Sequence, residues 1–121
     1  MFFKSSLGRR ILRADNVWKE QRFIAAVPAG LIDSTLIGED AEQPLILQGA
    51  VDCMFEENGK LYIVDFKTDR CYNKAELWGR YGVQLKLYSE AMAQVTGKTI
   101  ADCMLYSFYM NDVVEDPEKN S

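Results

Sequence analysis

The stretch LYIVDFKTDR, residues 61–70, reads for five positions as a half-buried strand and then carries Asp65 and Lys67 two residues apart. Side chains alternate between the two faces of a strand, so this acid and this base point to the same face. Taken alone, the stretch is also typical of a strand that ends in solvent. A second acid, Asp52, lies on the preceding apolar stretch. Its position relative to Asp65 helps to decide between a chemical site and a solvated strand end.

A tight turn between the two stretches predicts that the two acids meet. Asn58 and Gly59 are the best hairpin signal in the chain, and counting back from a two-residue turn places Asp52 directly opposite Asp65. Lys67 then joins them on the same face. A three-residue turn with a bulged glycine would shift this register by one residue. The other face is predicted to be the core side, with the apolar set Val51, Cys53, Phe55, Tyr62, Val64 and Phe66.

Such a pair of acids is costly unless something relieves it. Two carboxylates about 5 Å apart repel by roughly 3 kcal/mol at an effective dielectric near 20. A shared proton, Lys67 or a divalent cation can relieve the repulsion. The cation explains most, because oxygen ligands suit Mg²⁺ or Mn²⁺. It predicts Asp52, Asp65 and the backbone carbonyl of Phe66 as metal ligands, with Lys67 positioning water and stabilising charge on a phosphate.

The N-terminal half of the chain predicts a helix and then extended segments. Apolar residues at helical spacing over residues 6–14, behind a capping Ser6, predict a short helix whose basic face is either solvated or turned toward phosphates. Residues 17–27 mix aromatic and β-branched residues and stop at Pro28, which is typical of a strand. A second extended piece is predicted over residues 31–37.

The C-terminal half predicts the rest of the sheet and a long helix. The hairpin strands span residues 45–55 and 61–67, and residues 100–110 form a last strand inside the sheet. A helix between them is best explained as a crossover, so the fold class is α/β, with a mixed central sheet flanked by helices. Asn73 is expected to cap this helix and Gly97 to end it. Its apolar stripe consists of Leu77, Tyr81, Leu85, Tyr88, Met92 and Val95.

Length and composition exclude several classes of protein. A chain of 121 residues fits one small domain, and no apolar run approaches the roughly 18 residues of a membrane span. We therefore expect no membrane association and no targeting signal. Three cysteines without CxxC spacing suit a reducing cytoplasm and indicate neither disulfides nor a zinc site. A net charge of −4 argues against nucleic-acid binding by bulk electrostatics alone.

Three motifs resemble those of a known family. LQGAVD, IVDFKTD and YGVQLKLY are similar to the GxxD, DxK and QxxxY motifs of RecB-type nucleases in the PD-(D/E)XK superfamily. The likeness runs from about Ser6 to Tyr109 and is closest to the C-terminal nuclease domain of AddA-type ATP-dependent helicase/nuclease subunits. It implies a restriction-endonuclease-like core and magnesium-dependent phosphodiester hydrolysis. It also implies metal ligation by Asp52 and Asp65 and a catalytic Lys67.

The resemblance extends to residues outside the acidic pair. It places Gln84 and Tyr88 beside the site, on nucleic acid or supporting the lysine, and their four-residue spacing puts both on one helix face. Tyr88 fits equally in the core, whereas an amide such as Gln84 in an apolar stripe needs polar partners. Thr68 either donates to a phosphate or caps the strand end. Glu20 matches the acidic position of the family's ExxF strand and has no role assigned.

Two features depart from the family. The chain has no histidine, which the family commonly supplies to the metal site, and it carries no helicase motifs. Both are explained if residues 1–121 are a single nuclease domain from the C-terminal part of a larger helicase/nuclease.

We therefore expect a metal-dependent DNA exonuclease domain of an ATP-dependent enzyme that processes double-strand breaks for recombinational repair. ATP would serve only the parent helicase, and its partner would be a second, AddB-type protein of the same complex. The alternative is a catalytically inactive nuclease-like module for DNA binding or for the assembly of subunits.

Overall fold

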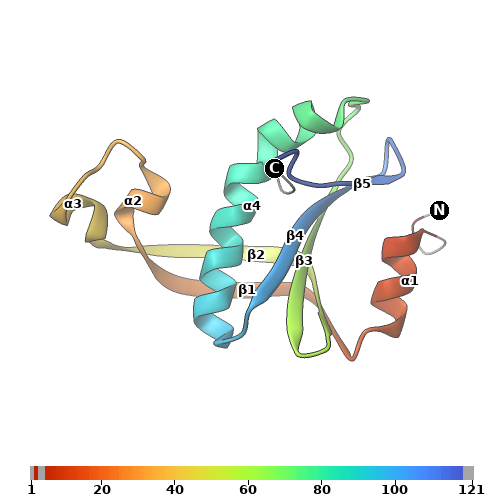
Figure 1. Cartoon of the computed structure of the whole chain (residues 1–121), viewed down its shortest axis with the longest axis horizontal. Coiled ribbons are helices and arrows are strands. Elements are labelled where there is room, and N and C mark those ends of the chain that lie inside the picture. The colour runs from red at the N-terminus through yellow and green to blue at the C-terminus, as the bar shows by residue number, and fades with distance from the viewer. Residues whose placement is uncertain (1, 3–4, 119–121) are drawn as a thin grey trace.

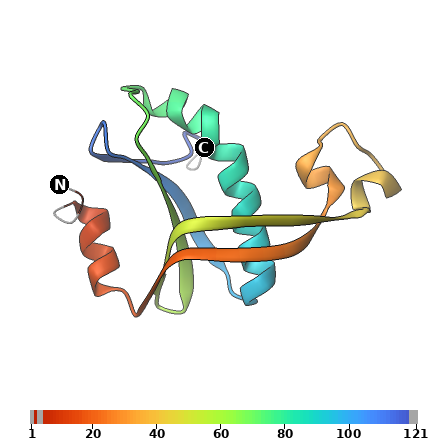
Figure 2. The same cartoon turned by 180° about the vertical axis from the view of Figure 1, so that it is seen from behind.

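The structure is a computed structural model that describes residues 2 and 5–118. These residues form a five-stranded mixed sheet in the order β1-β2-β3-β4-β5, with α1 and α4 packed against it (Figures 1 and 2). Only β3 and β4 are parallel, and α4 connects them as the predicted crossover. The α/β prediction is confirmed. The elements are α1 (Ser6–Arg13), β1 (Asn16–Pro28), α2 (Ala29–Ile32), α3 (Glu39–Glu42), β2 (Pro44–Glu57), β3 (Lys60–Lys67), α4 (Lys74–Thr96), β4 (Ile100–Ser107) and β5 (Asp112–Val114).

The turn between β2 and β3 has the predicted form. Asn58 and Gly59 both have positive φ, 53° and 78°, as a type I′ turn requires. The strands pair from Glu57 with Lys60 through Cys53 with Val64, so the two-residue register is confirmed.

The helix caps differ in one place from the prediction. Ser5, not Ser6, caps α1, because its hydroxyl oxygen accepts a hydrogen bond from the Gly8 N–H at 3.0 Å. Asn73 caps α4 as predicted by accepting from the Glu76 N–H at 3.0 Å. Gly97 ends that helix in the left-handed conformation, with φ 70°. Helix α4 therefore has both of its predicted ends.

The predicted extended piece over residues 31–37 is wrong. Its first residues end α2, and the side chain of Asp33 then turns the chain by accepting hydrogen bonds from the N–H and hydroxyl of Thr35, at 3.0 and 2.6 Å. The Ala29 N–H donates to the Gln43 carbonyl at 2.8 Å and closes the loop. The ribbon of β1 and β2 reaches away from the body with α2 and α3 at its far end (Figures 1 and 2).

The last strand is shorter than predicted, and a further strand follows it. β4 ends at Ser107, the chain turns through Asn111 with φ 54°, and β5 returns antiparallel to β4. Because β4 has β3 on one side and β5 on the other, its predicted internal position is confirmed. None of the described helices is long and apolar enough to cross a membrane.

Both faces of the sheet are buried, because α4 covers one and α1 the other. Along β3, Ile63 packs in the layer under α4 and Val64 in the layer under α1. Met54 joins Ile63 in the α4 layer, which is the larger of the two. The prediction of a single core side is therefore wrong, whereas Met54 and Ile63 cover the face of the acids, as their position beside Asp52 and Asp65 suggests.

Strand β2 changes face at Asp52. Val51 packs under α4, whereas Cys53, only two positions later, packs under α1. The predicted unbroken set is thus wrong at Val51, although its other five members lie together under α1. The neighbouring strand explains the change, because Glu20 lies across from Asp52 with φ 50°, a left-handed conformation that interrupts the ladder between β1 and β2.

Candidate active site

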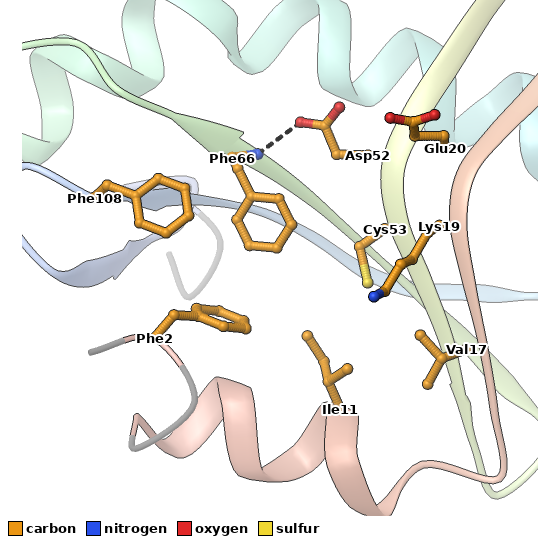
Figure 3. A pocket seen from close by; sticks show the side chains of 9 residues that line it. All are labelled: Phe2, Ile11, Val17, Lys19, Glu20, Asp52, Cys53, Phe66 and Phe108. Carbon is orange, nitrogen blue, oxygen red and sulfur yellow. Dashed lines mark hydrogen bonds between the residues drawn. The ribbon is translucent and has the colours of Figure 1, made fainter.

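Strands β2 and β3 separate just beyond the pair Cys53–Val64, and the next residue on each strand is an acid. Asp52 stays attached to β3, because the Phe66 N–H donates to its Oδ2 at 2.9 Å (Figure 3). The carboxyl groups of Asp52 and Asp65 lie close enough to share a hydrogen bond. The prediction that the two acids meet is confirmed, and we call the place where the strands part the fork.

The acid on β3 is paired with the lysine two positions later. Lys67 Nζ lies 2.9 Å from Asp65 Oδ2, and each side chain is 22% exposed. The pKa of Asp65 is raised to about 6, chiefly by burial and then by the hydrogen bond to Asp52, while Lys67 opposes the shift. One lysine therefore does not fully offset two crowded carboxylates. An added cation would relieve the remaining repulsion.

Lys67 is held from two directions. Its ammonium group lies 4.0 Å from the centroid of the Tyr81 ring and also contacts Asp65. Burial lowers the pKa of Lys67, but the hydrogen bond and charge of Asp65 raise it further, and the net shift is upward. The lysine therefore stays cationic at neutral pH.

Tyr81 and Asp69 support the site, a role that the sequence alone does not indicate. The Tyr81 hydroxyl donates to Asp69 Oδ2 at 2.7 Å, which ties α4 to the segment after β3. Arg80 also donates to this carboxylate, at 3.1 Å. The helical spacing assigns Tyr81 only to the apolar stripe. The one sequence signal for a polar role is its hydroxyl group, which could have been paired with the nearby Asp69.

The backbone of Phe66 presents a third oxygen to the fork. In a strand, the N–H and C=O of one residue point to the same side, so the N–H that reaches Asp52 implies a carbonyl directed the same way. Across the described residues no three His, Cys, Asp or Glu side chains cluster as a metal site. The donors available for a cation are thus the carboxylates of Asp52 and Asp65 and this carbonyl, and they fit Mg²⁺ or Mn²⁺, which keep several waters.

The QxxxY residues contact the GxxD strand through their tyrosine. Tyr88 packs edge to face on Phe23, with centroids 5.0 Å apart, and lies against Gly49. Gln84 Nε2 donates to the Tyr88 hydroxyl at 3.2 Å. The amide is exposed rather than set into the apolar stripe, and Val95 at the end of that stripe is 51% exposed.

The remaining candidate on β3 is Thr68. It is exposed just after the strand, and its side chain caps nothing in the part of the chain that the structure describes. The strand-end capping role is therefore not present.

Gly49→Ala should lower the free energy of unfolding by about 1–3 kcal/mol. An added Cβ would lie 2.8 Å from Cζ of both Phe23 and Tyr88, so both rings must move. Urea unfolding measures the loss. Gly79→Ala is the matched control, because a Cβ there meets nothing within 4 Å, and alanine in a helix interior should stabilise by up to about 1 kcal/mol. Equal stability of the Gly49→Ala and wild-type chains would contradict the close packing.

A pocket of about 600 Å³ opens on the α1 side of the fork. Asp52 forms part of its wall, and Glu20 lies next to Asp52 at the rim (Figure 3). Sequence reasoning did not predict this pocket. Its lining residues are Phe2, Ile11, Val17, Lys19, Glu20, Asp52, Cys53, Phe66 and Phe108.

The sequence of this chain is similar to those of known helicase/nuclease subunits. The chain is 39% identical over 115 residues to an ATP-dependent helicase/nuclease subunit of Clostridium botulinum strain Hall, and the match covers 94% of this chain and 9% of that protein. The protein of the same name from Alkaliphilus metalliredigens is 39% identical over 116 residues, covering 94% and 10%. The chain thus spans about a tenth of the length of these relatives. Residues 4–119 match the profile of the PD-(D/E)XK nuclease superfamily, and the chain belongs to that superfamily.

Proposed function

We propose that this chain is a metal-dependent DNA exonuclease domain. The observation that carries the proposal is the arrangement at the fork, where two carboxylates and a cationic lysine converge at the parting of two strands. Superfamily membership supports hydrolysis of a phosphodiester by this arrangement. We further propose that residues 1–121 are a single nuclease domain of a longer ATP-dependent helicase/nuclease, as the names and lengths of the relatives suggest.

Asp52, Asp65 and the Phe66 carbonyl would hold Mg²⁺ or Mn²⁺. The bound cation would supply Lewis-acid stabilisation of the scissile phosphate. The Phe66 N–H fixes the orientation of Asp52 by donating to one of its oxygens and leaves the other oxygen available. Burial and the neighbouring carboxyl group of Asp52 disfavour the ionised form of Asp65, so a bound cation would stabilise this carboxylate.

Lys67 would stabilise the negative charge that develops on the phosphate. Its ammonium group is already placed by Asp65 and by the Tyr81 ring, so little reorganisation is needed when substrate arrives. A donor held in place before the reaction stabilises a transition state better than a mobile one.

Three further residues would form the nucleic-acid-binding part of the site. Thr68 is exposed immediately after the catalytic lysine, and its hydroxyl is free of hydrogen bonds within the described range, so it can donate to a phosphate. Gln84 and Tyr88 form a linked pair on α4 above the GxxD strand. The exposed amide would face the strand of DNA, while the tyrosine positions it.

The parent protein would use ATP for its helicase activity, act in the repair of double-strand breaks and pair with an AddB-type protein. These proposals rest on the names of the relatives as helicase/nuclease subunits. This chain would contribute cleavage of the unwound strand, and cytoplasmic location would follow from that role.

The test is digestion of end-labelled linear single-stranded DNA by this chain. We expect fragments that shorten with time in Mg²⁺ or Mn²⁺ and intact DNA in EDTA. The competing function is an inactive nucleic-acid-binding module, which the small number of acidic ligands at the fork favours. DNA binding without cleavage, here and in the longer protein, would support that module and overturn the nuclease proposal.

A further inference from the structure

We propose that the pocket on the α1 side of the fork binds an unpaired base of the DNA strand that is cut. The inference rests on the proposed nuclease function and adds to it a site that holds the base of the bound strand. The pocket has a volume of about 600 Å³ and shares Asp52 with the proposed metal site (Figure 3).

Aromatic rings form one side of this pocket. The rings of Phe66 and Phe108 stack with centroids 5.5 Å apart and an interplanar angle of 27°. The Phe108 side chain is 48% exposed, and Figure 3 shows it at the pocket wall together with Phe66 and Phe2. Every base has a π face, so an exposed phenylalanine ring can stack on any of them.

Two hydrogen-bonded residues, Phe66 and Asp52, connect the pocket with the fork. The Phe66 N–H holds Asp52, and its carbonyl is directed into the fork, while its side chain lies in the pocket on the α1 side. Asp65 and Lys67 point to the other face, toward α4. A phosphate held between Asp52 and Lys67 therefore has the pocket on one side, within reach of the base of an adjoining nucleotide.

The polar rim suits a nucleotide better than an apolar side chain of a protein. Figure 3 shows the Lys19 ammonium group directed into the pocket from β1. Lys19 forms no ion pair among residues 2 and 5–118, unlike Arg10 on α1, which pairs with Glu57 at 2.8 Å. The Lys19 ammonium group offers a contact to a phosphate and offsets part of the charge of the Asp52 and Glu20 carboxylates, while the aromatic wall offers a contact to the base.

The consequence for substrate choice is geometric. A base stacked on Phe108 inside the pocket cannot also pair with a complementary strand. The pocket would therefore give a structural reason for the single-stranded substrate proposed above, because an intact duplex must unpair locally before its base can enter.

The experiment compares two short single-stranded oligonucleotides on the same backbone, an oligothymidylate and one made of abasic residues. Fluorescence anisotropy measures their binding to the wild-type chain in Ca²⁺, which replaces Mg²⁺ so that the DNA stays intact. We expect the oligothymidylate to bind about tenfold more tightly than the abasic strand. Phe108→Ala should remove most of that difference, and Phe108→Tyr should retain it.

Tyr109→Ala is the matched control. Tyr109 is the next residue, is 41% exposed and packs on Tyr72 with centroids 4.6 Å apart, away from the pocket. It should leave both affinities within about twofold. Thermal unfolding shows whether each variant is folded, and Phe108→Tyr keeps the test valid should Phe108→Ala fail to fold, because a tyrosine that lost the base preference would contradict the proposal.

The outcomes separate this inference from the proposed function. If the chain cleaves DNA but Phe108→Ala binds the oligothymidylate as the wild type does, the nuclease proposal stands and the base pocket is wrong. If Phe108→Ala weakens the thymidine and abasic strands equally, the pocket does not read the base, and the inference is again wrong. A chain that neither binds nor cleaves DNA would overturn both.

Discussion

Lys67→Ala should lower the rate of Mg²⁺-dependent DNA cleavage by at least about a thousandfold while changing DNA affinity only a few-fold. The ammonium group is the one cation that lies against the acidic pair among the described residues, 2.9 Å from Asp65. A charge placed at the reacting phosphate contributes most in the transition state, whereas affinity is distributed over many phosphate contacts. Single-turnover digestion of labelled DNA and anisotropy in Ca²⁺ measure the two quantities separately.

Lys74→Ala is the control for Lys67→Ala. Lys74 also forms an ion pair, 2.7 Å from Asp112, but it lies at the exposed start of α4. Its removal should leave cleavage within about twofold, because exposed ion pairs contribute little. Wild-type cleavage by the Lys67→Ala protein would remove the lysine from the mechanism, and equal losses in both variants would indicate a general charge effect.

Mn²⁺ should bind this chain more weakly as the pH falls through about 6. The pKa of Asp65 is raised to about 6, so below that pH a proton occupies the carboxylate that the metal needs. The affinity should decrease about tenfold per pH unit below 6 and change little above 7. Isothermal titration calorimetry between pH 5 and pH 7.5 measures the dependence. An affinity that is the same at both ends of this range would contradict the assignment of Asp65 as a ligand.

In the metal-free protein, the raised pKa of Asp65 makes the fold less stable, not more stable, as the pH rises. The folded state binds the proton of Asp65 more tightly than the unfolded state, so this group stabilises the fold below its ordinary pKa of 3.8, and the stabilisation is lost as the pH rises through about 6. Mn²⁺ should restore stability at pH 7.5 by replacing the proton.

Two variants test whether Mn²⁺ binds at the fork or at any carboxylate of the surface. Asp52→Asn should lower Mn²⁺ affinity at least about tenfold at pH 7.5, because it removes one of two carboxylates. Asp112→Asn is the control, because it also removes a carboxylate. Asp112 lies on the surface, away from the fork, and its pKa is lowered by Lys74. Equal Mn²⁺ affinities for the wild-type and Asp52→Asn chains would contradict the proposed ligand set.

The local part of the site was predictable because its geometry follows from a short turn. Asn58 and Gly59 adopt positive φ, and pairing outward from them determines that Asp52 and Asp65 are neighbours. The ends of α4 were equally local, since Asn73 and Gly97 act within one turn of the helix.

What the sequence did not predict depends on contacts between distant segments. The change of face at Asp52 depends on Glu20 across the β1–β2 ladder, and strand alternation alone contains no signal for it. The contact of Tyr88 with Gly49 and the pocket at Phe108 require the packed positions of α4 and α1. The prediction of an extended piece over residues 31–37 failed for a different reason. The hydrogen bond that the Asp33 side chain accepts from the Thr35 N–H outweighed the extended preference of the apolar residues.

The parting of β2 and β3 has a consequence for the exchange of backbone amides with solvent. From Glu56 to Cys53, β2 has a strand on each side, but from Val51 back to Pro44 it pairs with β1 alone. Alternate N–H groups in that outer half therefore have no neighbouring strand to protect them, and in deuterated water the boundary between slow and fast exchange should lie at Asp52. Cys53 would thus be the last position of β2 with a strand on each side, and the proposed catalytic acid would stand just beyond it, between the full sheet and a two-stranded ribbon that opens more readily.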